Sequence, residues 1–363
     1  MNWVKLPAVM VTAALFGLPA LSALAQDDTP VADHRDIEIA YVLHGLNTFT
    51  EEMVAGAEDA ARDYGVTLET FGDAAFDAGT EQANFEAALE QGVDGIAVAP
   101  LEGDRWIAPI QEAADQGVPV VGFNVTSLDS ALETWVGQDD FASGVTLGSE
   151  FIRQLAGAGV TEGAIAVGSC NPDENVLQDR EAGLRTAFAG TAFTVLDTQD
   201  VHLAVTENLA AWEHLIADQP DIVAAVGLCY VDVPNLVTVK ERSGGTWLIG
   251  GYNLDAPTLD ALKSGQAQVV IGQQEYLQGY LPVAILAEHL INGSPIVTGW
   301  LETPAEVVTP ENIDEYAARE MDDQQQRDYY REYINARFAD LQSASRPYDD
   351  LRAIGAVGAT PVP

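Results

Sequence analysis

Strand-like runs of β-branched residues alternate with helix-length amphipathic segments along most of this chain, and this alternation limits its fold more than any other feature. In the first half the predicted helices end at Gly65, Gly92 and Gly117, where a left-handed cap is needed. The alternation predicts a parallel sheet covered by helices on both faces. The predicted strands here are 37–43, 66–71, 95–100, 118–123 and 135–138, and the predicted helices are 51–63, 81–91 and 104–116.

The same rhythm then restarts. The predicted strands of this second unit are 163–168, 193–197, 222–228, 247–251 and 267–273, and its predicted helices are 143–155, 181–188, 206–217, 234–241 and 278–291. A chain of 363 residues is long enough for two domains. The sequence therefore predicts an α/β protein with two doubly wound parallel-sheet lobes. A charged helical extension is expected over 310–342, and a flexible tail rich in Ala, Pro and Gly over 343–363.

The first 25 residues read as a signal peptide. Lys5 precedes an almost wholly apolar run from Leu6 to Leu21, and Ala23-Leu24-Ala25 supplies small residues at a cleavage site. The run is too short, and too interrupted by proline and glycine, for a membrane span. No cysteine follows the cleavage site, so a lipid anchor is not expected. These features predict export to a Gram-negative periplasm.

Composition excludes one class of ligand. The formal net charge is −40, whereas binding to nucleic-acid phosphates requires many Lys and Arg side chains. The acidity indicates either a surface that repels acidic substrates or adaptation to high salt, where dense carboxylates keep a surface hydrated. The two cysteines, Cys170 and Cys229, are either buried thiols or a disulfide, which an exported protein can form.

Ligands of doubly wound sheets bind beyond the carboxyl ends of the strands. The residues at these ends are mostly amides and aromatics, which suit the hydroxyls and the apolar faces of a sugar. The alternative is that they are ordinary turn and cap residues. The set comprises His44, Asn47, Phe49, Asp73, Asn124, Ser169, Cys170, Tyr230, Tyr252 and Asn253, with Gln138 and Gln273 on segments between the units.

Over residues 37–308 the chain resembles the periplasmic sugar-binding proteins of the ribose-binding type. The landmarks are Asn47-Thr-Phe49 ahead of Gly56-Ala57, Gln91-Gly-Val-Asp-Gly-Ile96, Gly117-Val-Pro-Val-Val121 before Asn124, Gln138-Asp-Asp140 with Gly144, Arg180-Glu-Ala-Gly183, Ile249-Gly-Gly-Tyr-Asn253 and Ile271-Gly-Gln273. The resemblance implies three crossings between lobes, near Gln138/Asp139, Gln273/Gln274 and Trp300–Pro304. It implies an N-terminal lobe of 36–138 with 274–302 and a C-terminal lobe of 139–273 with 303–309.

The resemblance also implies roles for single residues. Asn47 and Gln273 match residues that bind sugar hydroxyls, and Phe49 and Tyr252 match aromatic walls. Arg180 matches an arginine of the second lobe that reaches sugar oxygens.

The chain also departs from the family pattern. The family usually has Asp at the positions of Asn124 and Asn253, Arg at Val125, an aromatic residue at Thr50 and Asn at Cys229. A polyol, a deoxy-sugar or another modified sugar fits this lining. A sugar acid is an alternative, because Arg180 would then lack a neutralising Asp nearby.

Strand order makes one further prediction. Cys170 and Cys229 end the first and third strands of the second unit, which are neighbours in a 2-1-3 sheet. Their Cα atoms can then approach the ~5.5 Å that a disulfide requires. We therefore expect a disulfide on the cleft floor of the second lobe.

The predicted function is that of a monomeric solute-binding protein, which closes on a small neutral sugar or polyol and delivers it to an ABC permease in the inner membrane. No Gly-x-Ser-x-Gly elbow or phosphate loop occurs, and the five His residues lack metal-ligand spacing, so no enzyme, cofactor or metal is expected. A sensory protein serving a chemoreceptor or an autoinducer remains an alternative, and a periplasmic carbohydrate-active enzyme a weaker one. A repressor would need a basic DNA-binding segment where the signal peptide stands.

Overall fold

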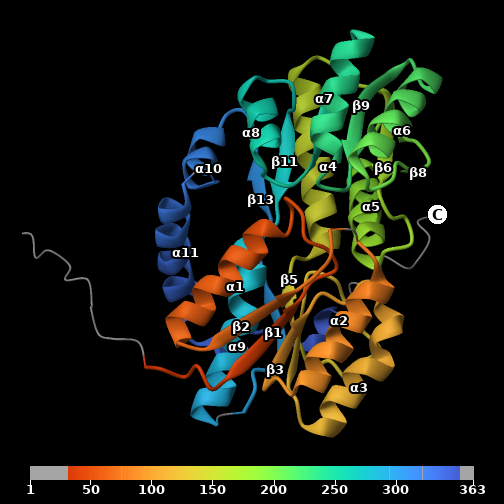
Figure 1. Cartoon of the computed structure of the whole chain (residues 1–363). Helices are drawn as coiled ribbons and strands as arrows, with labels where there is room; N and C mark the ends of the chain where they lie inside the picture. Colours follow the sequence, from red (N-terminus) through yellow and green to blue (C-terminus); the bar gives the residue numbers. More distant parts are fainter. Residues whose placement is uncertain (1–31, 75, 294, 321, 352–363) are drawn as a thin grey trace, which may run out of the picture. The chain divides into compact units, whose positions relative to one another are not determined.

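The computed structural model describes residues 32–74, 76–293, 295–320 and 322–351. The predicted signal peptide and residues 352–363 of the predicted tail lie outside this part. Within it, strands and helices alternate as the sequence predicts and form two separate sheets (Figure 1). None of the helices in these ranges is both long enough and apolar enough to cross a membrane.

The first sheet has six strands in the order β12-β5-β4-β3-β1-β2, all paired in parallel. Neighbouring residues of one strand point to opposite faces, so Ile39 and Tyr41 join one apolar core while Ala40 and Val42 join another. Both faces are therefore buried, as expected of a parallel sheet. The strands are β1 (Glu38–Val42), β2 (Thr67–Phe71), β3 (Gly95–Val98), β4 (Val120–Phe123), β5 (Thr134–Gly137) and β12 (Gly299–Glu302).

Helices cover both faces of this sheet. On one face α1 (Glu51–Tyr64) packs against α9 (Glu275–Asn292), which comes from much later in the sequence. On the other face lie α2 (Ala78–Gln91) and α3 (Ile107–Gln116), the latter preceded by the 3-10 turn η1 (Gly103–Trp106).

The second sheet has seven strands, in the order β13-β11-β10-β9-β6-β7 with β8 beside β6. All pairs are parallel except that of β13 with β11. One face packs on α4 and α5, and the other on α6, α7 and α8. The elements are α4 (Asp140–Gly157), β6 (Gly163–Ser169), α5 (Asn175–Phe188), β7 (Phe193–Val195), β8 (Gln199–Asp200), α6 (Val205–Asp218), β9 (Ile222–Gly227), α7 (Asp232–Ser243), β10 (Leu248–Tyr252), α8 (Ala256–Lys263), β11 (Val269–Gly272) and β13 (Glu306–Val308).

From β1 to β13 the chain passes between the sheets at three places: between β5 and α4, between β11 and α9, and between β12 and β13. These passages lie where the family resemblance implies crossings, and they bring residues from distant parts of the sequence to the carboxyl ends of both sheets. The exact lobe limits given above remain predictions.

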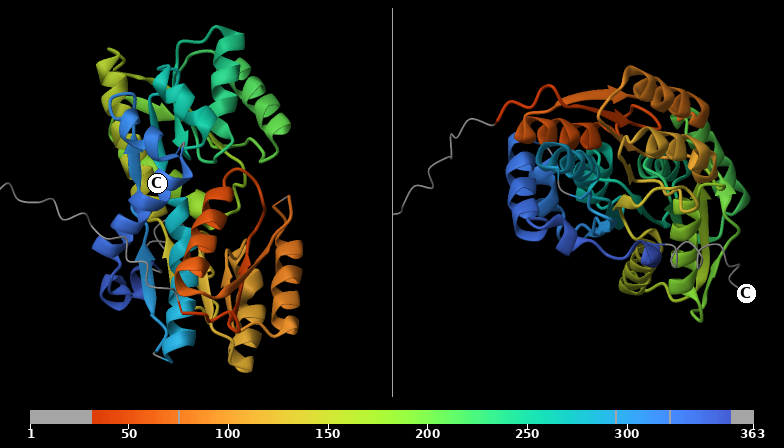
Figure 2. Two further views of the ribbon diagram at one scale, coloured as in Figure 1. Left: turned by 60° about the vertical axis from the view of Figure 1, so that its left-hand side comes forward. Right: turned by 90° about the horizontal axis from the view of Figure 1, so that it is seen from below.

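The predicted helical extension forms α10 (Ile313–Glu320), α11 (Asp323–Arg337) and α12 (Leu341–Ala344). α10 and α11 run along one side of the molecule (Figures 1 and 2). The expected loose tail does not begin at residue 343. Trp300 and Arg346 exchange two backbone hydrogen bonds of 2.8 Å, and Leu351 is buried in a core of the first sheet.

Candidate functional site

A cavity of about 290 Å³ lies between the two sheets and takes its lining from both. The residues of the first sheet's side are His44, Phe49, Phe76, Asp77, Ala78, Leu101, Glu102, Asn124 and Val125. Those of the second sheet's side, with the crossing, are Cys170, Asn171, Glu174, Val176, Leu177, Arg180, Leu203, Cys229, Tyr230 and Gln273. A cavity of this size is close to the lower limit of small-molecule sites, about 300 Å³.

The structure brings eight of the sequence-predicted residues to this cavity, and their contact with a ligand stays a prediction. They are His44, Phe49, Asn124, Arg180, Tyr230 and Gln273, with both cysteines. The rule that parallel strands direct their following residues to one edge accounts for most of them. Arg180 is different, because it projects from within α5.

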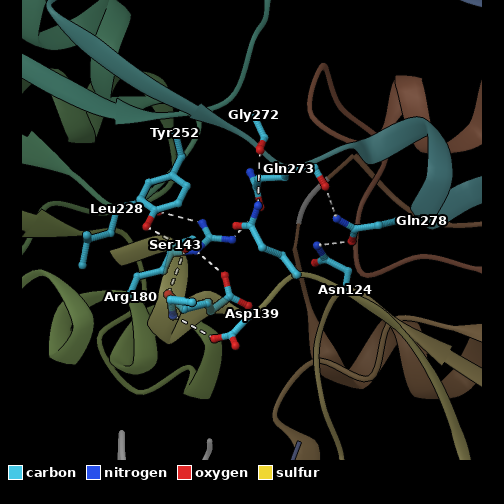
Figure 3. Close-up of polar contacts among 12 residues, drawn as sticks. Asn124, Asp139, Ser143, Arg180, Leu228, Tyr252, Gly272, Gln273 and Gln278 are labelled. Carbon is cyan, nitrogen blue, oxygen red and sulfur yellow. Dashed lines mark hydrogen bonds and ion pairs between the residues drawn. The ribbon is translucent and has the colours of Figure 1, made fainter. Parts of the chain in front are cut away.

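Arg180 is held rigidly on the second-sheet side of the cavity (Figure 3). Its guanidinium donates to the Asp140 carboxylate over 2.6 Å, to the Leu228 carbonyl over 3.0 Å and to the Gln273 side-chain oxygen. It also lies 4.2 Å from the centre of the Tyr252 ring. The fixed fork of a guanidinium is thereby oriented before any ligand binds.

The ion pair with Asp140 removes the basis for the sugar-acid alternative. Both side chains are at least nine-tenths buried, and burial raises the pKa of Asp140 to about 6 while Arg180 opposes that rise. At neutral pH the pair is ionised and its charges cancel. Three further carboxylates line the cavity, at Asp77, Glu102 and Glu174, so the lining is net negative. The expectation that Arg180 lacks a neutralising Asp is wrong.

A chain of hydrogen bonds fixes the state of His44. The backbone carbonyl of Gln273 can only accept a hydrogen bond, so the side-chain nitrogen Nε2 of Gln278 donates to it over 2.8 Å. The Gln278 oxygen then accepts from Asn124 Nδ2 over 2.9 Å, and Asn124 Oδ1 faces His44 Nε2 at 3.0 Å. His44 Nε2 therefore carries the proton and donates it. Burial lowers the pKa of His44 to about 4, so the imidazole is neutral.

Asn124 makes these contacts from a left-handed backbone conformation, with φ of 57°. Asparagine tolerates this conformation better than most residues. Both ends of the Asn124 amide make hydrogen bonds within the protein. Asn124 and His44 together form part of the cavity wall.

An aromatic stack joins the two sides. The Phe49 ring lies 5.6 Å from the Tyr230 ring at 14°, and 6.2 Å from the His44 ring at 18°. Phe49 and Tyr230 also line a second cavity of about 570 Å³, which contains the predicted residue Asn253. The stack therefore borders both hollows, and Asn253 lies at the second one.

Six predicted residues do not line the first cavity, among them Ser169, which is buried, and Asn253, which lines the second cavity. The other four are Asn47, Asp73, Gln138 and Tyr252. Asn47 Oδ1 accepts the Phe49 N–H over 3.0 Å, so Asn47 is a turn residue ahead of α1. Asp73 is exposed. Gln138 donates to the Gly272 carbonyl over 3.2 Å at a crossing. Tyr252 is fully buried beneath Arg180, where its hydroxyl lies 3.0 Å from Ser143 Oγ.

Strand-end reasoning missed an apolar part of the lining and the buried acid Glu174. Leu101 and Glu102 come shortly after β3, so the same rule applies to them. Glu174 precedes α5 in a loop that gave no such signal. Its two oxygens accept the Asn175 N–H over 3.0 Å and, from the other side of the cavity, the Glu102 N–H over 3.2 Å.

A second hydrogen bond, from Asn175 Nδ2 to the Thr126 carbonyl over 3.1 Å, lies beside the Glu174 contact. Together with the Phe49–Tyr230 stack, these contacts join the two sides across the cavity. The structure therefore shows the two sheets in a closed arrangement.

Cys170 and Cys229 form a disulfide, with their Cα atoms 6.1 Å apart. β6 and β9, the strands that precede them, are neighbours in the sheet, which is the order that predicts the pairing. The disulfide lines the cavity as an apolar surface. Among the described residues no group of three or more His, Cys, Asp or Glu side chains could hold a metal ion.

Comparison with known proteins agrees with this architecture. The model of the periplasmic binding protein domain family matches residues 39–294. The xylose/arabinose-binding protein XylF of Sulfolobus acidocaldarius is 25% identical over 307 residues, which cover 79% of this chain and 74% of the relative. The ribose import binding protein RbsB of Bacillus subtilis is 23% identical over 296 residues, which cover 80% and 95%.

Two solved structures share the fold. An ABC transporter solute-binding protein from Burkholderia graminis, in complex with D-arabinose, has a TM-score of 0.72 at 22% identity, covering 78% of this chain and 98% of that one. A periplasmic solute-binding protein from Actinobacillus succinogenes with bound D-allose has a TM-score of 0.70 at 22% identity, covering 77% and 100%. With the family match over most of the described residues, these findings show that this chain belongs to the periplasmic binding protein family.

Proposed function

We propose that this protein captures a neutral sugar or polyol between its two sheets and delivers it, unchanged, to an ABC permease in the inner membrane after export to the periplasm. The observation that carries the proposal is the cavity between the two sheets, whose stacked aromatics, preset amides and charge-balanced arginine come from both sides. The names of the relatives support it, since they are sugar-binding proteins.

The cavity's chemistry favours a ligand with both apolar and polar faces. Phe49, Phe76 and Tyr230 offer flat aromatic surfaces for C–H groups, whereas Glu174 and the remaining N–H groups of Arg180 offer partners for hydroxyls. Closure strips water from the ligand, so each unmatched polar group costs about 1–3 kcal/mol. Selectivity follows from that penalty.

Thermal unfolding with pentoses, hexoses, polyols and sugar acids tests the proposal. A ligand that binds only the folded state, present at a hundred times its dissociation constant, adds about 2.7 kcal/mol to the free energy of unfolding. We expect a neutral sugar or polyol to stabilise the protein and to be recovered chemically unchanged. Sugar acids should give no stabilisation, because the cavity's carboxylates outnumber its cations.

Phe49→Ala should abolish the stabilisation, measured against that variant without ligand, because the aromatic wall is lost. Phe193→Ala is the matched control: it removes a ring from the Phe188–Phe193 pair of the second unit, away from the cavity, and should retain the stabilisation. Stabilisation by sugar acids alone, or an unchanged effect in Phe49→Ala, would contradict the proposal.

A further inference from the structure

The segment after the third crossing returns to the first sheet, although the family match ends at residue 294. Ile313 of α10 is buried in the core of the second sheet, whereas Tyr330 of α11 and Phe338 are buried in the core of the first sheet. Figure 1 shows α10 beside α8 and α11 beside α1. The chain thus crosses between the sheets a fourth time, between α10 and α11.

Two arginines of this segment bracket the third crossing. Arg319 donates two hydrogen bonds, of 2.8 and 2.7 Å, to the carboxylate of Glu306 at the start of β13, and both side chains are buried. Arg346 donates to the carboxylate of Glu302 at the end of β12 over 2.7 Å. Only residues 303–305 separate these two strands, so one arginine is attached on each side of the crossing.

Each arginine also contacts aromatic side chains. The Arg319 guanidinium lies 4.7 Å from the Tyr329 ring and 5.3 Å from the Tyr330 ring, both on α11. Tyr330 is fully buried and stacks on Tyr276 of α9, with centres 4.3 Å apart. Arg319 therefore contacts the second sheet through Glu306 and the helices of the first sheet through Tyr330.

Arg346 completes the arrangement on the first sheet. Its guanidinium lies 4.1 Å from the buried Trp300 ring of β12, and its backbone pairs with that of Trp300. Both carboxylates at the crossing thus have an arginine from the C-terminal segment.

We propose that residues 313–320 and 322–351 form a hinge clamp, which ties both ends of the third crossing and restricts rotation of one sheet relative to the other. This device is independent of the ligand and goes beyond the proposed function. Rotation that opens the cavity would strain the contacts of Arg319 with Glu306 and with Tyr330. The clamp therefore favours the closed arrangement and narrows the range of open ones.

Pulsed electron spin resonance on the full chain, without a ligand, measures how far the two sheets move relative to each other. Spin labels on Glu112→Cys in α3 and Ala210→Cys in α6, both exposed, report the distance between the two sheets while the native disulfide stays intact. Removing the buried pair as a unit, with Glu306→Gln and Arg319→Met, avoids leaving one charge unpaired. In this double variant we expect the distribution of label-to-label distances to be broader than in the parent protein and to include longer distances.

The exposed pair Arg242–Glu213 supplies the matched control, since Glu213→Gln with Arg242→Met removes an ion pair of the second unit remote from the crossing. This control should keep the distribution of the parent protein. Should the buried double variant fail to fold, Glu302→Gln with Arg346→Met removes the partly exposed pair and decides the question. Distributions that match the control in every folded variant would overturn the hinge clamp.

Discussion

At this site, the contacts that a side chain makes decide whether it lines the cavity more than its position after a strand does. The strand-end rule brought His44, Asn124 and Tyr230 to the cavity because parallel strands share one edge. It did not place Tyr252 or Asn47 on the lining of this cavity. Tyr252 is buried under Arg180, and Asn47 bonds the backbone of its own turn. A sequence shows that a residue is near an edge, but not which of its atoms are already bonded.

His44 gives a prediction in pH. Its pKa is lowered to about 4 in the folded protein from 6.5, so the unfolded chain takes up the proton first as the pH falls. The contribution of His44 to the free energy of unfolding therefore falls by about 3 kcal/mol between about pH 6.5 and 4. We expect nuclear magnetic resonance to find one imidazole that stays neutral, with its proton on Nε2, down to about pH 4.

The same effect appears in unfolding free energies. Buried acids such as Asp140 and Asp232, whose pKa values are raised to about 6, act in the opposite direction, so wild type must be compared with His44→Gln. The stability advantage of wild type over this variant should shrink by about 3 kcal/mol between pH 7 and pH 4. A constant difference would show that His44 titrates normally.

Arg180 gives a second prediction at this scale. Arg180→Met leaves the buried Asp140 carboxylate without its cation and should lower the free energy of unfolding by about 3–5 kcal/mol. Adding Asp140→Asn should restore most of that loss, because the remaining group is neutral. Urea unfolding measures both. Arg153→Met, at an exposed pair with Glu150, is the control and should cost under about 1 kcal/mol.

At the scale of elements, periodicity predicted the long strands and helices but not the short ones. α8, β12 and β13 have too few residues for a period to be read, and β13 pairs antiparallel, outside the βαβ rhythm. α5 begins at Asn175, six residues before the start of the predicted helix. The prediction began too late because the Asn-Pro-Asp-Glu sequence that precedes Asn175 resembles a turn. The predicted helix therefore began just after Arg180, whereas Arg180 lies on α5.

Close helix contacts give an element-scale prediction. A Cβ atom on Gly279 of α9 would lie 1.8 Å from the Met53 carbonyl of α1, which no packing allows. Gly279→Ala should therefore force the two helices apart and cost at least about 1–3 kcal/mol. Gly157→Ala at the end of α4 meets nothing within 4 Å and should be neutral or slightly stabilising. Equal chemical-denaturation midpoints for the two variants would contradict this account.

For the whole molecule, the repeated α/β pattern was sufficient to predict two sheets and the edges at which they meet. It could not predict the closed arrangement, because the Glu102–Glu174 and Phe49–Tyr230 contacts join segments far apart in the sequence. Nor could it predict that the C-terminal helices return to the first sheet, since their charged sequence indicates helices without naming a partner.

The most direct test of the central claim is a crystal structure of the protein with the neutral sugar or polyol that stabilises it most. The account predicts that this ligand lies between the two sheets, against Phe49 and Tyr230 and within hydrogen-bonding distance of Arg180. A ligand bound elsewhere, with this cavity filled only by water, would contradict it.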